Sequence, residues 1–109
     1  MEAPFPNINE GTVIAVTQLM HSPGYFPPYA VRMLVTHSAG CRVFTKVILW
    51  PSLAIVKAAI ISIQEQFLEE ENEHLDLMVT DNSPIFYLHQ FTTFLQERGI
   101  HLRLRADAA

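Results

Sequence analysis

The order of apolar and polar positions divides the first half of the chain into three strands. Short segments rich in β-branched residues lie at 11–17, 29–36 and 41–49, a composition typical of strands. The Pro- and Gly-rich segment 21–28 between the first two predicts a loop. The turn at 37–40 is short enough to predict a hairpin between the second and third strands. The sequence therefore predicts a three-stranded meander.

A helix is predicted after the third strand. Ser52, directly after Pro51, is the expected N-cap. Apolar residues at alternating three- and four-residue steps then form one stripe. The stripe consists of Leu53, Val56, Ile60, Ile63 and Phe67. Ile55 and Ile61 lie outside it and widen the apolar surface beyond what a helix buried on one side needs. We expect both residues to pack against a second layer or a second subunit.

The second half of the chain predicts a strand, a helix and a last strand. An acidic run at 69–73 is expected to be a solvated connection to a strand at 75–79. An amphipathic helix is expected to begin at Pro84 and to stop at Gly99, before a strand at 100–104. The fold class is therefore α/β. Asp81 follows a buried strand directly, where α/β sheets commonly place their chemistry.

Residues 80–100 resemble the segment around the second acid of retroviral and retrotransposon integrase catalytic cores. That segment typically reads T-D-N-G-x-x-F, then F, F-L and E-R-G-I. The matching residues are Thr80, Asp81, Asn82, Phe86, Phe91, Phe94, Leu95, Glu97, Arg98, Gly99 and Ile100. The resemblance implies a ribonuclease H-like fold, a three-strand meander followed by helix-strand-helix-strand. It implies a single integrase-core-like domain over 11–109, after an irregular lead-in at 1–10, without the C-terminal helices of a full core.

The resemblance also implies which site residues are missing. Such enzymes hold two divalent cations with three carboxylates. Ala15 is in the expected place of the first acid, and the third acid would fall beyond Ala109. Mg²⁺ binds through few protein groups, so Asp81 is a partial metal site at best. Because Ser83 and Pro84 replace the family's Gly and stiffen the turn, Asp81 is alternatively a cap or turn residue.

Composition limits the partners. The chain has 109 residues, of which 50% are hydrophobic and 17% charged, and a net charge of −4. The dispersed basic residues predict weak or no nucleic-acid binding. No apolar run reaches the ~18–20 residues of a membrane span. The single Cys41 excludes an internal disulfide and a Cys-based zinc site. We expect an intracellular protein, nuclear or cytoplasmic.

Three further residues have two interpretations each. His37 in the hairpin is expected to be solvated rather than to bind a metal. Cys41 shares a strand face with Val43 and Thr45, so we expect it to be buried rather than reactive. Trp50 at the end of the third strand is either an exposed interface residue or part of the edge of the core.

The favoured hypothesis is a catalytically inactive integrase-core-like domain from a mobile-element-derived protein. It would act as an interaction or dimerisation module without a cofactor, binding a second copy or another protein. One rival is a truncated or mutated polynucleotidyl transferase core of the DDE type, which would use Mg²⁺. The other is a regulatory domain resembling anti-sigma-factor antagonists, which also place an Asp before a helix but lack the meander. A C-terminal helix of a longer chain is the competing explanation for the apolar surface of the helix.

Overall fold

The computed structural model describes residues 12–104, so the lead-in predicted at 1–10 lies outside the described part. The predicted element order is confirmed, with one additional 3₁₀ helix, η1. The elements are β1 (Ile14–His21), β2 (Tyr29–His37), β3 (Gly40–Ile48), α1 (Leu53–Glu71), β4 (Leu77–Thr80), η1 (Pro84–Tyr87), α2 (His89–Glu97) and β5 (His101–Leu104). No helix among them is both long and apolar enough to cross a membrane.

The strands form one mixed sheet in the order β3-β2-β1-β4-β5. The meander β1–β3 is antiparallel, while β4 lies parallel to β1 and β5 parallel to β4. β1 is therefore in the centre, and its carboxyl end lies beside that of β4. The order and direction of the strands agree with the predicted ribonuclease H-like α/β architecture.

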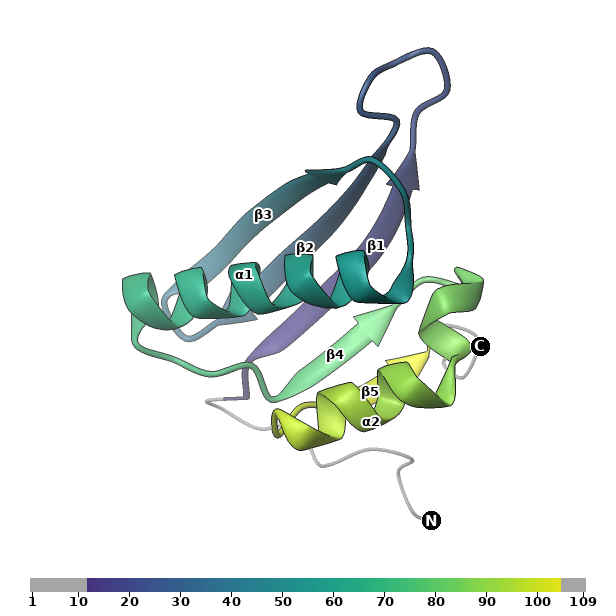
Figure 1. Ribbon diagram of the computed structural model, residues 1–109. Coiled ribbons are helices and arrows are strands. Elements are labelled where there is room, and N and C mark those ends of the chain that lie inside the picture. Colours follow the sequence, from purple (N-terminus) through teal and green to yellow (C-terminus); the bar gives the residue numbers. More distant parts are fainter. Residues whose placement is uncertain (1–11, 105–109) are drawn as a thin grey trace.

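Helices α1 and α2 lie on the same face of this sheet (Figure 1). Alternate residues of the central strands point toward them and are fully buried, among them Ala15 and Met33. They pack against Phe67 of α1 and Phe91 of α2 in one core. The alternating side chains of β1–β3 point to the opposite face, because successive residues of a strand face opposite sides. No helix of the described residues covers that second face.

The acidic run at 69–73 was predicted as a connection, and this prediction is wrong for most of it. Glu69, Glu70 and Glu71 form the last turn of α1. The helix ends at Asn72, which has a φ of 56° and donates its backbone N–H to the carbonyl of Leu68. Asn tolerates this left-handed conformation better than most residues. Contacts with β3, described below, hold the acidic turn in place.

The helix predicted to begin at Pro84 is divided in two. Residues 84–87 form η1, and Leu88 then adopts an extended backbone with φ −69° and ψ 137° before α2 begins. The first strand also differs from its predicted bounds of 11–17. It continues to His21 because β2 pairs with it along its whole length, ending with His21 opposite Tyr29.

Candidate functional site

Asp81 joins the end of β4 to the end of β1. Its backbone N–H donates to the carbonyl of Thr17 at 3.2 Å. Its Oδ2 accepts from the backbone N–H of Leu19 at 2.9 Å, and its Oδ1 accepts from the backbone N–H of Ser83 at 2.9 Å. Accepting a backbone N–H two residues further on is the geometry of an Asx turn. Each oxygen of a carboxylate retains a further lone pair, so metal binding by Asp81 stays a prediction.

The structure shows where Ala15, the position assigned to the first acid, lies relative to Asp81. Ala15 is opposite Met78 in the parallel register, and Thr17 is opposite Thr80. Ala15 is fully buried and points toward the helices. The register, continued by one residue, places Gln18 beside Asp81, because paired residues of parallel strands share one face. The residue next to Asp81 is therefore a neutral amide, three positions after Ala15.

Two threonines beside Asp81 were missed by the sequence reasoning. Thr17 and Thr80 are fully buried, and their hydroxyl oxygens have no hydrogen-bond partner among the described residues. They are opposite each other in the register and point toward the helices. The sequence does contain a signal that could have found them, because each is a polar residue near the end of an otherwise apolar strand. They make the core beside Asp81 polar without supplying a charge.

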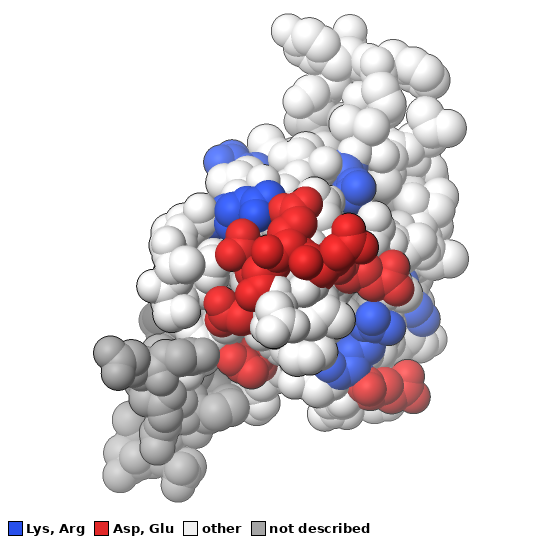
Figure 2. Space-filling view, turned by 90° about the vertical axis from the view of Figure 1, so that its left-hand side faces the viewer, with Lys and Arg blue, Asp and Glu red and all other residues white. Residues whose placement is uncertain are grey.

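Asp81 belongs to no cluster of three possible metal ligands within the described part of the chain. No three His, Cys, Asp or Glu side chains of residues 12–104 gather closely enough to hold a metal ion. The acidic side chains gather elsewhere, on the face at the C-terminal end of α1 (Figure 2). They lie there because α1 continues to Glu71. The carboxylate that suggested metal chemistry and the acidic run are therefore not brought together.

Arg42 of β3 connects the sheet to this acidic turn. Its Nη1 donates to Oε2 of Glu71 at 2.7 Å, and its Nη2 contacts Glu70. A hydrogen bond from Gln66 and a second one from Arg42 lower the pKa of Glu70. The hydrogen bonds to Glu70 and Glu71 in turn raise the pKa of Arg42. These groups are at the surface, so the pairs fix the end of α1 without a large effect on stability.

The three predicted interface residues differ in exposure. Trp50 is 63% exposed and lies with its ring edge-on to Tyr29, with centroids 6.1 Å apart. It is thus a surface residue and not part of the core edge. Ile55 is 38% exposed, whereas Ile61 is partly buried against the core. Part of the additional apolar surface predicted for this helix is therefore buried in the core. A role of Trp50, Ile55 and Ile61 in an interface stays a prediction.

The predictions for His37 and Cys41 are wrong. The His37 side chain is only 3% exposed, because it faces α1, where its ring lies edge-on to Phe67. Its Nδ1 lies 3.1 Å from Oε1 of Glu73. Cys41 is exposed, because its face of β3 is the one that no described helix covers. The sequence reasoning assigned the correct alternation to β3 but exchanged its two faces.

The comparisons with known proteins support the fold. No protein-family model matches the chain, and no curated protein matches it. Two similar solved structures both have a TM-score of 0.60. The catalytic core domain of BIV integrase is 15% identical, over 84% of this chain and 53% of that chain. A chain of the simian T-cell lymphotropic virus intasome in complex with PP2A regulatory subunit B56 gamma is 13% identical. The match covers 95% of this chain and 36% of that chain.

These likenesses confirm the integrase-like, ribonuclease H-like fold predicted from residues 80–100. At 13–15% identity they show the fold alone. The chain spans about half of the first similar structure's chain and about a third of the second's.

Proposed function

We propose that this chain is a catalytically inactive domain of integrase-core fold that acts as a protein-interaction module. The observation that carries the proposal is the bonding of Asp81, whose two oxygens both accept backbone N–H groups. A carboxylate committed to fixing a turn is restricted in the geometry that it can offer to a cation. The site would then need no cofactor, and Mg²⁺ would be needed only by an active enzyme.

The residue beside Asp81 supports the same proposal. Catalysis by two cations needs several converging carboxylates, since one metal activates the attacking oxygen and the other stabilises the leaving oxygen. Gln18, which the register places beside Asp81, supplies a neutral amide. An amide oxygen is a weaker partner for a hard cation than a carboxylate. Asp81 beside Gln18 thus supports the hypothesis that the chain comes from a mobile-element-derived protein whose catalytic activity has been lost.

The test of inactivity uses metal binding and DNA cleavage. We expect no Mg²⁺ or Mn²⁺ binding by titration calorimetry at physiological concentration, and no nicking or strand transfer with labelled DNA ends. Asp81→Asn should leave both results unchanged. Metal-dependent nicking that Asp81→Asn abolishes would overturn the proposal and establish the DDE-type enzyme instead.

For the interaction itself, the outer face of α1 is the surface that would pair with a second copy. Ile55 is 38% exposed, and Leu68, more than three turns further along the same helix, is 37% exposed. Ala54 and Ala58 near Ile55 are also exposed and are small enough for two helices to approach closely. A two-fold axis through this face would bring the same patch of both subunits together. Trp50, just before α1, would lie at its margin.

The oligomeric state tests this pairing. Sedimentation equilibrium should give a discrete dimer that Ile55→Glu dissociates, with the fold retained by circular dichroism. Val47→Glu is the matched control, because it places the same charge at an exposed apolar residue of the opposite face of the sheet. A strict monomer, or a dimer that Ile55→Glu leaves intact, would exclude pairing through α1. The exposed Cys41 thiol is compatible with the proposed intracellular location, nuclear or cytoplasmic.

A further inference from the structure

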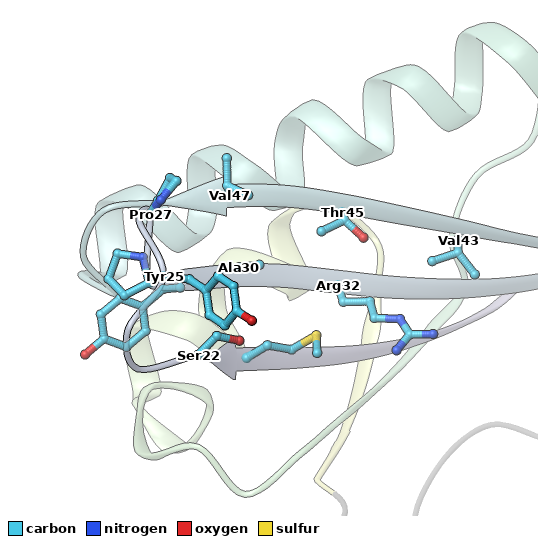
Figure 3. A pocket seen from close by; sticks show the side chains of 11 residues that line it. Ser22, Tyr25, Pro27, Ala30, Arg32, Val43, Thr45 and Val47 are labelled. Atoms are coloured by element: carbon cyan, nitrogen blue, oxygen red, sulfur yellow. The ribbon is translucent and has the colours of Figure 1, made fainter.

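The face of the sheet opposite α1 and α2 contains an apolar groove. It is a hollow of about 550 Å³ over β1–β3, closed at one end by the loop 22–28 (Figure 3). We call it the sheet groove. Its floor includes Met20, Val43 and Val47, which are 39%, 52% and 64% exposed, and Tyr25 of the loop is 75% exposed. Its volume is in the range of ~300–1,000 Å³ usual for binding pockets.

Arg32 lies within this apolar surface. It is on β2, opposite Thr45 of β3 and Gln18 of β1 in the antiparallel registers, and Figure 3 shows it beside β3, which carries Thr45 and Val43. Among the described residues its guanidinium makes no hydrogen bond, ion pair or ring contact. The contrast is Arg42, whose guanidinium binds two carboxylates. Arg32 is thus an unpaired cation, flanked by the neutral side chains of Gln18 and Thr45 on the neighbouring strands, within a hollow that is otherwise mainly apolar.

The combination of an apolar floor and one unpaired cation defines the chemistry of an occupant. Covering the groove removes water from Arg32, and a desolvated charge without a partner is costly. An occupant must therefore bring a carboxylate to Arg32. The exposed Met and Val side chains favour apolar side chains on either side of it. Tyr25, an exposed aromatic residue that lines the groove, is of a type that often dominates binding energy.

We propose that the sheet groove binds a segment of another protein in which apolar side chains flank one Asp or Glu. The inference rests on the proposed interaction function and assigns its partner to a surface separate from the outer face of α1. A nucleic acid fits less well, because one arginine on a floor of Val and Met offers a single phosphate contact. A second copy of the chain is the other candidate occupant, and the oligomeric state of the Arg32 variant below distinguishes it from a separate protein.

The experiment is a display library of short random peptides panned against the 109-residue chain. We expect the enriched peptides to share one acidic residue between apolar residues. Synthetic peptides of the enriched sequences should shift the NMR signals of β1–β3 and of the loop 22–28. Arg32→Glu should weaken binding of these peptides by about tenfold or more. It should also favour a peptide in which Lys replaces the acidic residue.

Lys46→Glu is the matched control, because Lys46 is on β3 opposite Val31 and therefore faces the helices. It changes the charge equally and should leave peptide binding unchanged. Val47→Asn tests the apolar floor and should weaken binding without loss of the fold. Enriched peptides without an acidic residue, or equal effects of Arg32→Glu and Lys46→Glu, would overturn the inference. So would a dimer that Arg32→Glu dissociates, since the occupant would then be a second copy. Each of these results is independent of the metal and nicking assays that test catalytic inactivity.

Discussion

Asp81 illustrates at the scale of one residue how the same side chain can serve chemistry or structure. Its position after β4 is the one at which α/β enzymes use carboxylates. Its contacts, however, are two backbone N–H groups, one from Leu19 and one from Ser83. Both donors would lose their acceptor if the carboxylate were removed. The contribution of Asp81 to stability is therefore measurable apart from any activity.

We predict that Asp81→Ala lowers the free energy of unfolding by about 1–2 kcal/mol. Two partly buried backbone donors would be left without an acceptor. Urea unfolding followed by circular dichroism measures the change. The control is Asn82→Ala, which removes only an exposed hydrogen bond to Tyr87 and should stay within about 0.5 kcal/mol of the parent. A more stable Asp81→Ala variant would argue for a functional carboxylate, because residues selected for activity often destabilise the fold.

At the scale of elements, the end of α2 shows how local hydrogen bonds set the path into β5. The N–H of Gly99 donates to the carbonyl of Gln96, and the N–H of Ile100 donates to that of Leu95. These two bonds form a Schellman motif. It requires the left-handed backbone of Gly99, whose φ is 76°. A Cβ at Gly99 would contact no atom within 4 Å, so the requirement is conformational rather than steric crowding.

Gly99→Ala should lower the free energy of unfolding by about 1 kcal/mol. The cost is that of holding an L-residue at positive φ, and thermal or urea unfolding measures it. Gln96→Ala is the control, since Gln96 is an exposed residue of the same helix and Ala favours helix. Equal stability of the two variants would show that the end of α2 relaxes to another geometry at no cost.

The ion pairs between Arg42 of β3 and the last turn of α1 should make the free energy of unfolding depend on pH. The pKa of Glu70 is lowered by hydrogen bonds from Gln66 and Arg42. A carboxyl with a lowered folded-state pKa stabilises the fold fully above its unfolded-state pKa, and the contribution is lost as the pH falls through the folded value. Glu70→Gln should therefore cost stability at neutral pH, and the cost should shrink below about pH 4.5.

Urea titrations at several pH values between neutrality and about pH 3 test this dependence. Glu65→Gln serves as the control, because Glu65 is exposed on the same helix and makes no contact with Arg42. Its difference from the parent should not change with pH. A Glu70→Gln difference that stays constant over the same range would show that the pair does not form in solution.

At the scale of the whole molecule, charge and apolar surface are separated. The chain has a net charge of −4, and acidic side chains gather over the C-terminal end of α1 (Figure 2). Several exposed apolar side chains lie instead on the opposite face of the sheet and at the loop 22–28, among them Met20, Val43, Val47 and Tyr25. We therefore expect the molecule to repel polyanions.

We predict that non-specific binding to duplex DNA is weaker than the ~10⁻⁴–10⁻⁶ M usual for DNA-binding proteins at physiological salt. Fluorescence anisotropy with a labelled duplex measures it. The variant Glu65→Lys with Glu69→Lys, which neutralises the net charge of −4, should bind more tightly and with a steeper salt dependence. Low-micromolar, steeply salt-dependent binding by the parent chain would contradict the prediction.

The sequence by itself determined the elements and their order. Alternation in β1–β3, the three- and four-residue steps of α1 and the Gly99 stop are local signals, because each depends on neighbours within a few residues. The motif at 80–100 was equally local, and it identified the integrase-like fold that two solved structures with a TM-score of 0.60 confirm.

Only the tertiary structure decided which face of each element is covered. The alternation of β3 is the same whichever face meets α1, so Cys41 was assigned to the wrong side. His37 was expected in a solvated turn, but it is the last residue of β2 and faces α1. The parallel register of β1 and β4, set by packing between residues more than 60 positions apart, placed Gln18 rather than Ala15 beside Asp81. The sheet groove and the unpaired Arg32 within it exist for the same reason, since both helices pack on one face and leave the other exposed.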